Sequence, residues 1–561
     1  METSFNLLRE PWLPVELEDG KRASVRPGDI SQPIDGQKIM RIASGRPDCD
    51  ISTTEFLIGL LAVTFGPHDG HAWKALYSDP PSQDELEAAL RPIEATLTLD
   101  GEGPLFFQDQ EQLTGDDVSV EALFIDAPGS STTRDNADHF VKRGRTGALS
   151  RAGAAIALLT LQTSAPSGGA GHRTSLRGGG PLTTLVLPGM VGNAEPTLWQ
   201  RLWANVPGGM RESTDGYARV FPWVIETRVS DSSGVTTTPE DVHEAQAFFG
   251  MPRRIRLNFE PNPERRPCDL LGIVDDVIVT NYATRPWGAN YVSWSRGHPL
   301  SPYYKPRETD AEYLPLHLKS SRVGYRQYLG LVVPDPDGLR VPARCVSDFQ
   351  TRAQYFKGEE RRALLNCRLL AVGYAMDNMK ALDFGEALMP LVMTGDTTCD
   401  EQVRELAKRF ITSADFAASQ LISATKRALY GERGDAKWNS SVFDAVRNRI
   451  WSDTEEPFYR TLGIAAKNLF ASRENLADQL AAIQQEFGSS WRIVLRQACL
   501  AIFDDAVPIE DAQSDKIKDV IEGRKMLVFA LEGYGPVGKK IFGELSLPLP
   551  AKKPAKGRMA A

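Results

Sequence analysis

Two runs of apolar residues at helical spacing dominate the C-terminal third of the chain. Neighbours in each run are three or four positions apart, which places them on one face of an α-helix. The first run is Val403, Leu406, Phe410, Ala414, Ala417, Leu421, Ala424 and Ala428. The second is Leu476, Leu480, Ile483, Phe487, Trp491, Val494, Ala498 and Ile502. With further helical patterns over 442–471 and 516–531, the sequence predicts an antiparallel four-helix bundle whose apolar stripes form its core.

Before this region the pattern changes to short β-prone runs interrupted by Pro and Gly. An Asp19-Gly20 pair inside 13–25 predicts a β-hairpin. Residues 53–65 and 148–160 have the spacing of two further helices. The predicted fold class is therefore α+β, because helices and hairpins mix without a regular βαβ alternation.

Three regions follow from these patterns. Residues 1–383 are expected to form a large mixed α/β N-terminal domain. Residues 384–545 are expected to form the C-terminal four-helix bundle. Residues 546–561 contain Lys and Arg among Pro, Ala and Gly, a composition that predicts a disordered basic tail.

Positive charge gathers between His139 and Ala194. This window has no Asp or Glu, although the chain has 73 acidic residues in 561, a frequency that would place about seven here. Its basic residues are Lys142, Arg143, Arg145, Arg151, Arg173 and Arg177. The formal net charge of the whole chain is −9, which excludes a generally basic nucleic-acid coat protein. Contact with a polyanion must therefore be local.

A glycine-rich segment, 167–180, lies inside this window. It opens with Ser167, Gly168, Gly169, Ala170 and Gly171. Glycine allows a backbone to approach a ligand closely, and the N–H groups of such loops can surround phosphate oxygens. The segment therefore predicts contact with nucleic acid or phosphate.

The rest of the sequence offers little chemistry. The six cysteines are scattered without a CxxC pair, which is typical of a reduced, cytoplasmic protein. No signal peptide or membrane span is predicted, and no cofactor is expected. The segment 533–540 partly matches a phosphate loop, but no strand precedes it, so it is interpreted as a helix-ending turn. His68, Asp69 and His71 leave a metal-dependent nuclease open as an alternative.

Four segments occur in a distinctive order: Phe5–Val15, Phe140–Thr184, Gly288–Tyr303 and Gly373–Lys380. Together they resemble the large subunit (CasA family) of the type I-E CRISPR Cascade surveillance complex. The resemblance implies a non-catalytic subunit that recognises the protospacer-adjacent motif (PAM) in duplex DNA. It also implies help in starting strand separation and in recruiting a helicase-nuclease in antiviral defence. The implied partners are guide CRISPR RNA, double-stranded target DNA, the backbone and small subunits of the complex, and the helicase-nuclease.

The resemblance also implies how the glycine-rich segment is used. Ser167–Gly171 would approach the minor groove or the sugar-phosphate edge of DNA. His172, Arg173 and Arg177 would then donate to phosphates, which sets position rather than sequence.

Two further DNA-contacting elements are implied. A hairpin would insert a wedge beneath the PAM and split the next base pair; Asn378 aligns with this wedge, with Asp377 and Met379 beside it. A basic side chain would reach the minor groove from the segment before 298–302. Arg285 is assigned to that role, with Asn290 and Arg296 behind it.

The segment 140–150 resembles the family's loop that contacts the guide RNA and the PAM region. Phe140 would supply an aromatic contact, and Lys142, Arg143 and Arg145 would contact phosphates. This loop is expected to order on binding.

Three more arginines, Arg253, Arg254 and Arg256, lie on a predicted strand, with the last two on one face. The sequence leaves open whether they contact DNA or form ion pairs. Some members of the family hold zinc with paired cysteines in the region where this chain has only Cys268, so no zinc site is predicted.

A subunit that only bridges proteins and contacts guide RNA is the alternative from another functional class. If the chain were such a scaffold, or the metal-dependent nuclease considered above, these loops would not need to recognise the PAM.

Overall fold

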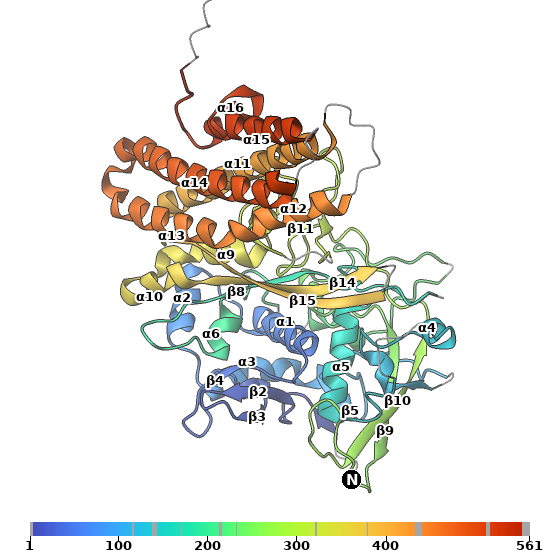
Figure 1. Cartoon of the computed structure of the whole chain (residues 1–561). Helices are drawn as coiled ribbons and strands as arrows, with labels where there is room; N and C mark the ends of the chain where they lie inside the picture. Colours follow the sequence, from blue (N-terminus) through green and yellow to red (C-terminus); the bar gives the residue numbers. More distant parts are fainter. Residues whose placement is uncertain are drawn as a thin grey trace, which may run out of the picture. The chain divides into compact units, whose positions relative to one another are not determined.

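The computed structural model describes residues 4–114, 117–136, 143–169, 171–212, 216–231, 233–319, 323–377, 380–431, 440–511 and 516–551. The chain divides into two compact units (Figure 1). The mixed unit comprises Met1–Arg322 and Gly330–Leu388, and the helical unit comprises Val323–Leu329 and Met389–Ala561. A mixed α/β unit and a C-terminal helical unit confirm the predicted fold class.

The mixed unit opens with the predicted hairpin. Strands β2 (Leu13–Leu17) and β3 (Arg22–Val25) pair in antiparallel fashion, and β4 (Ile39–Ile42) pairs with the other edge of β2. Gly20 has φ +81° at the turn, a backbone conformation that side chains other than glycine adopt at a cost. The Asp-Gly signal was therefore sufficient to locate this turn.

Two buried helices form the centre of the mixed unit. Helix α1 (Pro47–Thr64) packs along α5 (Arg151–Ser164) (Figure 1). Ser150 caps α5 by accepting from the N–H of Gly153 at 3.1 Å, as side-chain oxygens do at helix N-termini. Helix α5 ends where the glycine-rich segment begins, so the segment starts from a fixed point.

Two sheets flank this centre. Strands β9 (Arg254–Pro261) and β10 (Val277–Arg285) form an antiparallel ribbon, and β10 also pairs with β6 (Val118–Ser119) and β7 (Leu149–Ser150). The other sheet has the order β15-β14-β8 and consists of β8 (Thr183–Leu187), β14 (Arg368–Asp377) and β15 (Lys380–Pro390).

The remaining strands are short: β1 (Phe5–Asn6), β5 (Thr98–Asp100), β11 (Tyr303–Tyr304), β12 (Leu314–Pro315) and β13 (Arg340–Val341). The other helices of the mixed unit are α2 (Gly70–Ser78), α3 (Gln83–Leu90), α4 (Ser130–Arg134), α6 (Leu198–Trp203), α7 (Tyr217–Val220), α9 (Arg344–Arg352) and α10 (Gly358–Ala363). Helix α8 (Tyr328–Leu331) lies where the chain passes from one unit to the other.

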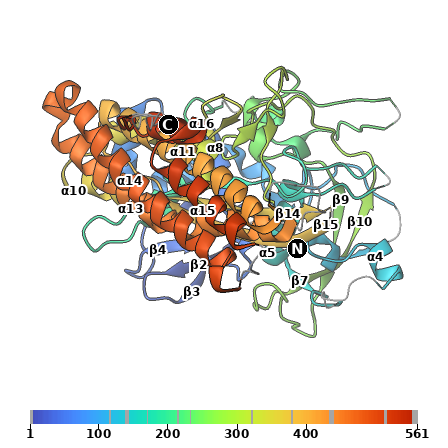
Figure 2. The same cartoon turned by 45° about the horizontal axis from the view of Figure 1, so that its top comes forward.

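The helical unit is formed by α11 (Thr397–Tyr430), α12 (Ser440–Asp453), α13 (Glu455–Ala471), α14 (Leu476–Ala506), α15 (Ile517–Leu531) and α16 (Gly535–Glu544). Figure 2 shows α11, α13, α14 and α15 lying side by side. The indole N–H of Trp491 donates to the Phe410 carbonyl at 2.9 Å, and the two rings stack with centroids 5.5 Å apart. The first predicted stripe is buried throughout. In the second, Leu480, Val494 and Ala498 are half-buried and the other positions are buried.

A segment from earlier in the chain completes this core. Tyr325 stacks on Phe458 with ring centroids 4.6 Å apart, and its hydroxyl lies 2.7 Å from Thr454 Oγ1. Buried aromatic pairs of this kind contribute about 0.5–1.5 kcal/mol beyond their buried area. This packing is why Val323–Leu329 belongs to the helical unit.

In the segment 533–540, Gly533 and Tyr534 form the turn between α15 and α16, and residues 535–540 are the first part of α16. Gly533 has φ +86°; its N–H donates to the Ala530 carbonyl and that of Tyr534 to Phe529, both at 3.0 Å. This pair of bonds is the Schellman arrangement that ends helices, which confirms the interpretation as a turn. No helix in the described residues is long and apolar enough to cross a membrane.

Candidate nucleic-acid interface

The glycine loop, Ser167–Gly171, is closed by backbone hydrogen bonds. The N–H of His172 donates to the Gly169 carbonyl at 2.8 Å, and that of Gly180 donates to Ser164 at 3.1 Å. Ser167, Gly168 and Gly169 are exposed, and Ala170 lies outside the described residues. Gly169 has φ +68°, and a Cβ added there would meet no atom within 4 Å. The loop therefore presents bare backbone at the surface.

Trp287 lies against this loop. The backbone N–H of Trp287 donates to the Gly171 carbonyl at 2.9 Å. A Cβ on Gly171 would lie 2.8 Å from the Trp287 ring. The side chain is 39% exposed, and its φ of +68° is unusual for a bulky residue. Strained conformations of this kind persist where the surrounding structure requires them, often at functional sites. The sequence pattern did not indicate this residue.

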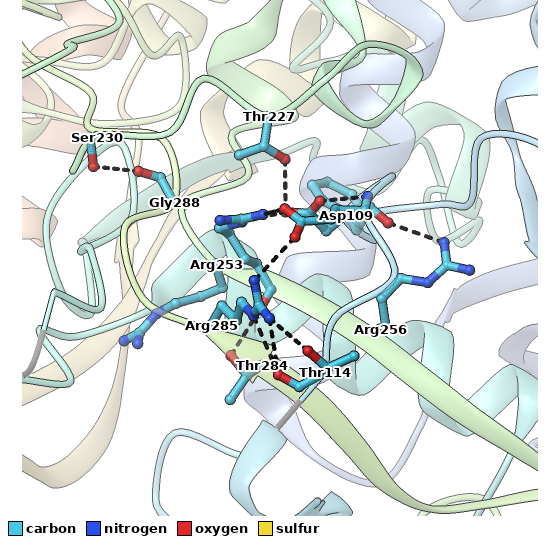
Figure 3. A network of polar contacts seen from close by, with 12 residues as sticks. Asp109, Thr114, Thr227, Ser230, Arg253, Arg256, Thr284, Arg285 and Gly288 are labelled. Atoms are coloured by element: carbon cyan, nitrogen blue, oxygen red, sulfur yellow. Dashed lines mark hydrogen bonds and ion pairs between the residues drawn. The ribbon is translucent and has the colours of Figure 1, made fainter. Parts of the chain in front are cut away.

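Arg173 connects Trp287 to a neighbouring loop. Its guanidinium lies over the Trp287 ring at 5.1 Å, a distance at which cations are attracted to aromatic faces. Its Nε donates to Ser230 Oγ at 2.8 Å, and Ser230 Oγ donates to the Gly288 carbonyl at 2.6 Å (Figure 3). Half-buried Arg173 thus holds the loop and Trp287 in one arrangement.

Arg177 does not join this surface. Its side chain is 2% exposed and lies 2.5 Å from Glu55, itself 4% exposed. It also donates to Thr183 Oγ1 at 3.0 Å and Ser301 Oγ at 3.1 Å. Because a buried carboxylate and two hydroxyls occupy its donors, the structure favours a structural role for Arg177 over the predicted contact with phosphate.

The end of the glycine-rich segment packs against β14. A Cβ on Gly180 would lie 2.6 Å from Met376 and 2.7 Å from Tyr374. Strand β14 ends at Asp377, which is exposed, and its partner β15 begins at Lys380. Asn378 and Met379 lie outside the described residues. The structure thus brings the glycine-rich segment beside the strand that leads to the predicted wedge.

Arg285 lies at the end of β10, opposite Arg254 on β9. Its Nη1 is 3.1 Å from Glu111, and its Nη2 donates to Thr114 Oγ1 at 2.7 Å (Figure 3). The side chain is 38% exposed. Arg285 is therefore partly available to a ligand, but a carboxylate already balances its charge.

The structure also distinguishes among the three arginines near β9. Arg254 is buried and forms ion pairs with Asp109, at 2.7 Å, and with Glu111. Arg256 donates to the Asp109 carbonyl at 3.0 Å. Both contacts support a structural role on that face. Arg253 instead lies beside the glycine loop, where a Cβ on Gly168 would be 2.7 Å from its Nη1.

The predicted RNA-facing loop is described from Arg143 onward; Phe140 and Lys142 lie outside the described residues. Arg143 donates to the Thr133 carbonyl at 3.0 Å. The N–H of Arg145 donates to Glu121 at 2.8 Å, and its side chain is 59% exposed. Arg145 also borders a surface cavity of about 260 Å³. Its guanidinium lies 3.9 Å from Asp126, so a carboxylate partly balances the charge of this exposed side chain.

The residues of the nuclease alternative do not converge. Asp69 caps α2 by accepting from the N–H of Ala72 at 2.8 Å, and His71 packs against the ring of Tyr355. Within the described residues, no group of three or more His, Cys, Asp or Glu is arranged to hold a metal ion. Asp69 thus has a local structural role.

Three histidines of the mixed unit have lowered pKa values. Burial, joined by the charge of Arg253, lowers the pKa of His172. Burial and the charge of Arg177 lower the pKa of His298 well below its ordinary value, although Glu55 lies 3.8 Å away. Burial also lowers the pKa of His317. These rings are therefore neutral at pH 7.

Acidification is expected to destabilise the mixed unit between pH 6.5 and 5.5. Below pH 6.5 the unfolded chain binds protons that the folded rings of His172, His298 and His317 do not, so stability falls as pH falls. Each ring contributes up to about 1.4 kcal/mol per pH unit. Thermal unfolding from pH 7.5 to 5.5 measures this slope. His298→Gln should reduce the slope, because it removes one of the three rings whose pKa is lowered. A thermal midpoint independent of pH in this range would contradict the prediction.

Comparison with known proteins gives a consistent result. The family model for CRISPR-associated protein Cse1 matches residues 6–502. Thermus thermophilus CasA (Cse1) has 16% identity and a TM-score of 0.62, with 94% of this chain and 99% of that chain covered. Acidimicrobium ferrooxidans Cse1 has 19% identity and a TM-score of 0.62, covering 96% and 100%. A chain of a structure described as a CRISPR RNA-guided surveillance complex has 15% identity and a TM-score of 0.63, covering 94% and 99%.

Proposed function

The chain belongs to the Cse1 (CasA) family of CRISPR-associated proteins, and we propose that it recognises the PAM as the large subunit of an RNA-guided surveillance complex. A structural relative is described as part of such a complex. In guided effectors, base pairing to the RNA reads the target, while protein reads the short flanking motif in the duplex.

One observation carries this proposal: an exposed glycine backbone, a strained aromatic and the wedge strand lie together. Gly168 and Gly169 are exposed, Trp287 packs on Gly171, and Gly180 packs on Met376. Bare backbone suits the close approach of a minor groove, and a half-exposed aromatic ring suits the deoxyribose edge. A duplex held there would meet the strand that leads to Asn378.

Strand separation would follow from the wedge. Asn378, with Asp377 and Met379, would enter the base stack below the PAM and take the place of the base pair that opens. Unstacking a step costs about a few kcal/mol, which the inserted side chains would offset by packing on the exposed base. Arg285 would add a minor-groove contact.

The remaining partners follow from the same role. Phe140, Lys142, Arg143 and Arg145 would contact guide RNA and the PAM region. The helical unit would contact the small subunits. The assembled complex, in the cytoplasm, would then recruit a separate helicase-nuclease, and this chain would itself catalyse nothing.

Selection from a DNA library tests PAM recognition. The reconstituted complex is incubated with duplexes randomised beside the target, and bound sequences are counted. The intact complex is expected to select particular flanks, and Asn378→Ala is expected to weaken duplex opening, reported by a fluorescent base in the first target pair. Asn193→Ala, at an exposed position in another turn, is the matched control.

Two outcomes would contradict the proposal. Flank-independent binding, with this subunit still required for assembly, would favour a protein-bridging scaffold that contacts only guide RNA. Divalent-metal-dependent cleavage by the isolated chain, lost on His68→Ala, would favour a nuclease.

A further inference from the structure

Arg253 has an uncommon environment for an arginine. The residue is 9% exposed. The side-chain amide of Gln162, on α5, binds the backbone of Arg253. It accepts from the Arg253 N–H and donates to the Arg253 carbonyl, both at 3.0 Å. Its Nη2 donates to the carbonyl of Pro166, while its Nε is buried and has no hydrogen-bond partner. The guanidinium is thus held in place but incompletely satisfied.

Its charge is also uncompensated. Among the described residues, no carboxylate forms an ion pair with Arg253, whereas neighbouring Arg254 has Asp109 and Glu111. Burial lowers the pKa of Arg253 to about 10, so the guanidinium stays charged at pH 7. A buried charge without a counter-ion costs several kcal/mol. An anion bound nearby would remove part of this cost.

The guanidinium lies directly beneath the glycine loop. A Cβ on Gly168 would be 2.7 Å from Nη1 and 3.3 Å from Nη2 of Arg253. Gly168 and Gly169 are exposed on the other side. The backbone of Gly168 therefore lies between the guanidinium and the exposed side of the loop, and charges interact more strongly across protein than across water.

The other nearby donors are already engaged or neutral. Arg173 donates to the side chain and carbonyl of Ser230 at 2.8 and 2.7 Å, and the lowered pKa leaves His172 uncharged. The N–H of Gly168 likewise donates to the His172 carbonyl, at 3.3 Å. We propose that Arg253, through its charge, and the backbone of Gly169 form a seat for one phosphodiester oxyanion on the exposed side of the loop. This inference rests on the proposed DNA-binding function and assigns phosphate binding to a side chain that acts through its charge from beneath the loop.

Salt dependence tests the seat in the reconstituted complex. Duplex affinity is measured between 50 and 200 mM salt for the wild type, Arg253→Met, Arg253→Lys and Arg265→Met. Each phosphate neutralised contributes about 0.9 to the slope of log affinity against log salt. Arg253→Met should lower the slope by about this amount and reduce affinity about tenfold at low salt. Arg253→Lys should retain the slope.

Arg265→Met is the matched control, because Arg265 is an exposed arginine between β9 and β10. It should leave slope and affinity unchanged. An unchanged slope in Arg253→Met, with flank selection intact, overturns the seat and leaves the proposed function standing. If the wild-type complex selected no particular flanking sequence, the proposed function itself would be overturned.

A second measurement tests the seat even if Arg253→Met folds poorly. It also distinguishes binding of inorganic phosphate from binding of a phosphate in a DNA strand. Inorganic phosphate and a short phosphodiester duplex are titrated separately into the full-length chain, and the His172 imidazole is followed by NMR. An anion seated beside this ring should raise its pKa, and Arg253→Lys should preserve the response. Response to both ligands indicates a general phosphate seat, and response to the duplex alone indicates a strand phosphate. No response to either overturns the proposal.

Discussion

Arg177→Met is expected to lower the free energy of unfolding of the mixed unit by about 3–5 kcal/mol. The substitution leaves the Glu55 carboxylate charged and 4% exposed without its ion-pair partner. It also removes donors to Thr183 and Ser301, which link β8 to the segment before β11. Breaking one side of a buried pair is costly because the remaining charge stays out of water.

Chemical denaturation of the purified chain measures this effect. The double variant Glu55→Gln/Arg177→Met should recover part of the loss, because no buried charge is then left alone. Arg265→Met removes an exposed pair with Asp276, 3.6 Å apart, and should cost less than about 1 kcal/mol. Equal losses in the buried and exposed cases would show that Glu55–Arg177 does not behave as a buried pair.

Gly171→Val is expected to weaken duplex binding by the assembled complex at least tenfold, or about 1.4 kcal/mol. Its Cβ would lie 2.8 Å from the Trp287 ring, and its φ of +85° disfavours a β-branched side chain. Either the loop or Trp287 must then move. The surface formed by the glycine backbone and the aromatic ring would lose its arrangement.

Gly20→Val is a matched control for backbone strain. Gly20 has φ +81° in the β2–β3 turn, and a Cβ there would meet nothing within 4 Å. Both variants should lose some stability, but only Gly171→Val should lose DNA affinity and alter the fluorescence of Trp287. Equal affinities for the two variants would exclude a specific role for the loop.

Helical periodicity predicted the core of the helical unit well, with one instructive difference. After Trp491 the buried positions of α14 are Leu495, Cys499, Ile502 and Phe503. Of the predicted positions, Ile502 is buried, whereas Val494 and Ala498 are half-buried. A repeat of 3.6 residues permits steps of three or four. The choice at each step depends on neighbouring helices, which the spacing of one helix does not reveal.

Composition alone located the glycine loop, but it did not predict the environments of the arginines in and near that loop. Arg173, Arg177 and Arg253 are alike in sequence terms, yet one is half-buried beside Trp287, one pairs with Glu55 and one lies beneath Gly168. Glu55 is 122 positions from Arg177. Local charge counts therefore could not separate structural arginines from those at the surface.

Features with local causes could be predicted from the sequence: the Asp19-Gly20 turn, the helical stripes, and an acid-free stretch around a glycine loop. Only tertiary contacts place Trp287 on Gly171, Gly180 against β14, and Val323–Leu329 in the helical unit. The physical reason is that turns and helices depend on backbone conformation and neighbours within a few residues. Burial, counter-ions and strained contacts depend on partners that only the folded chain brings together.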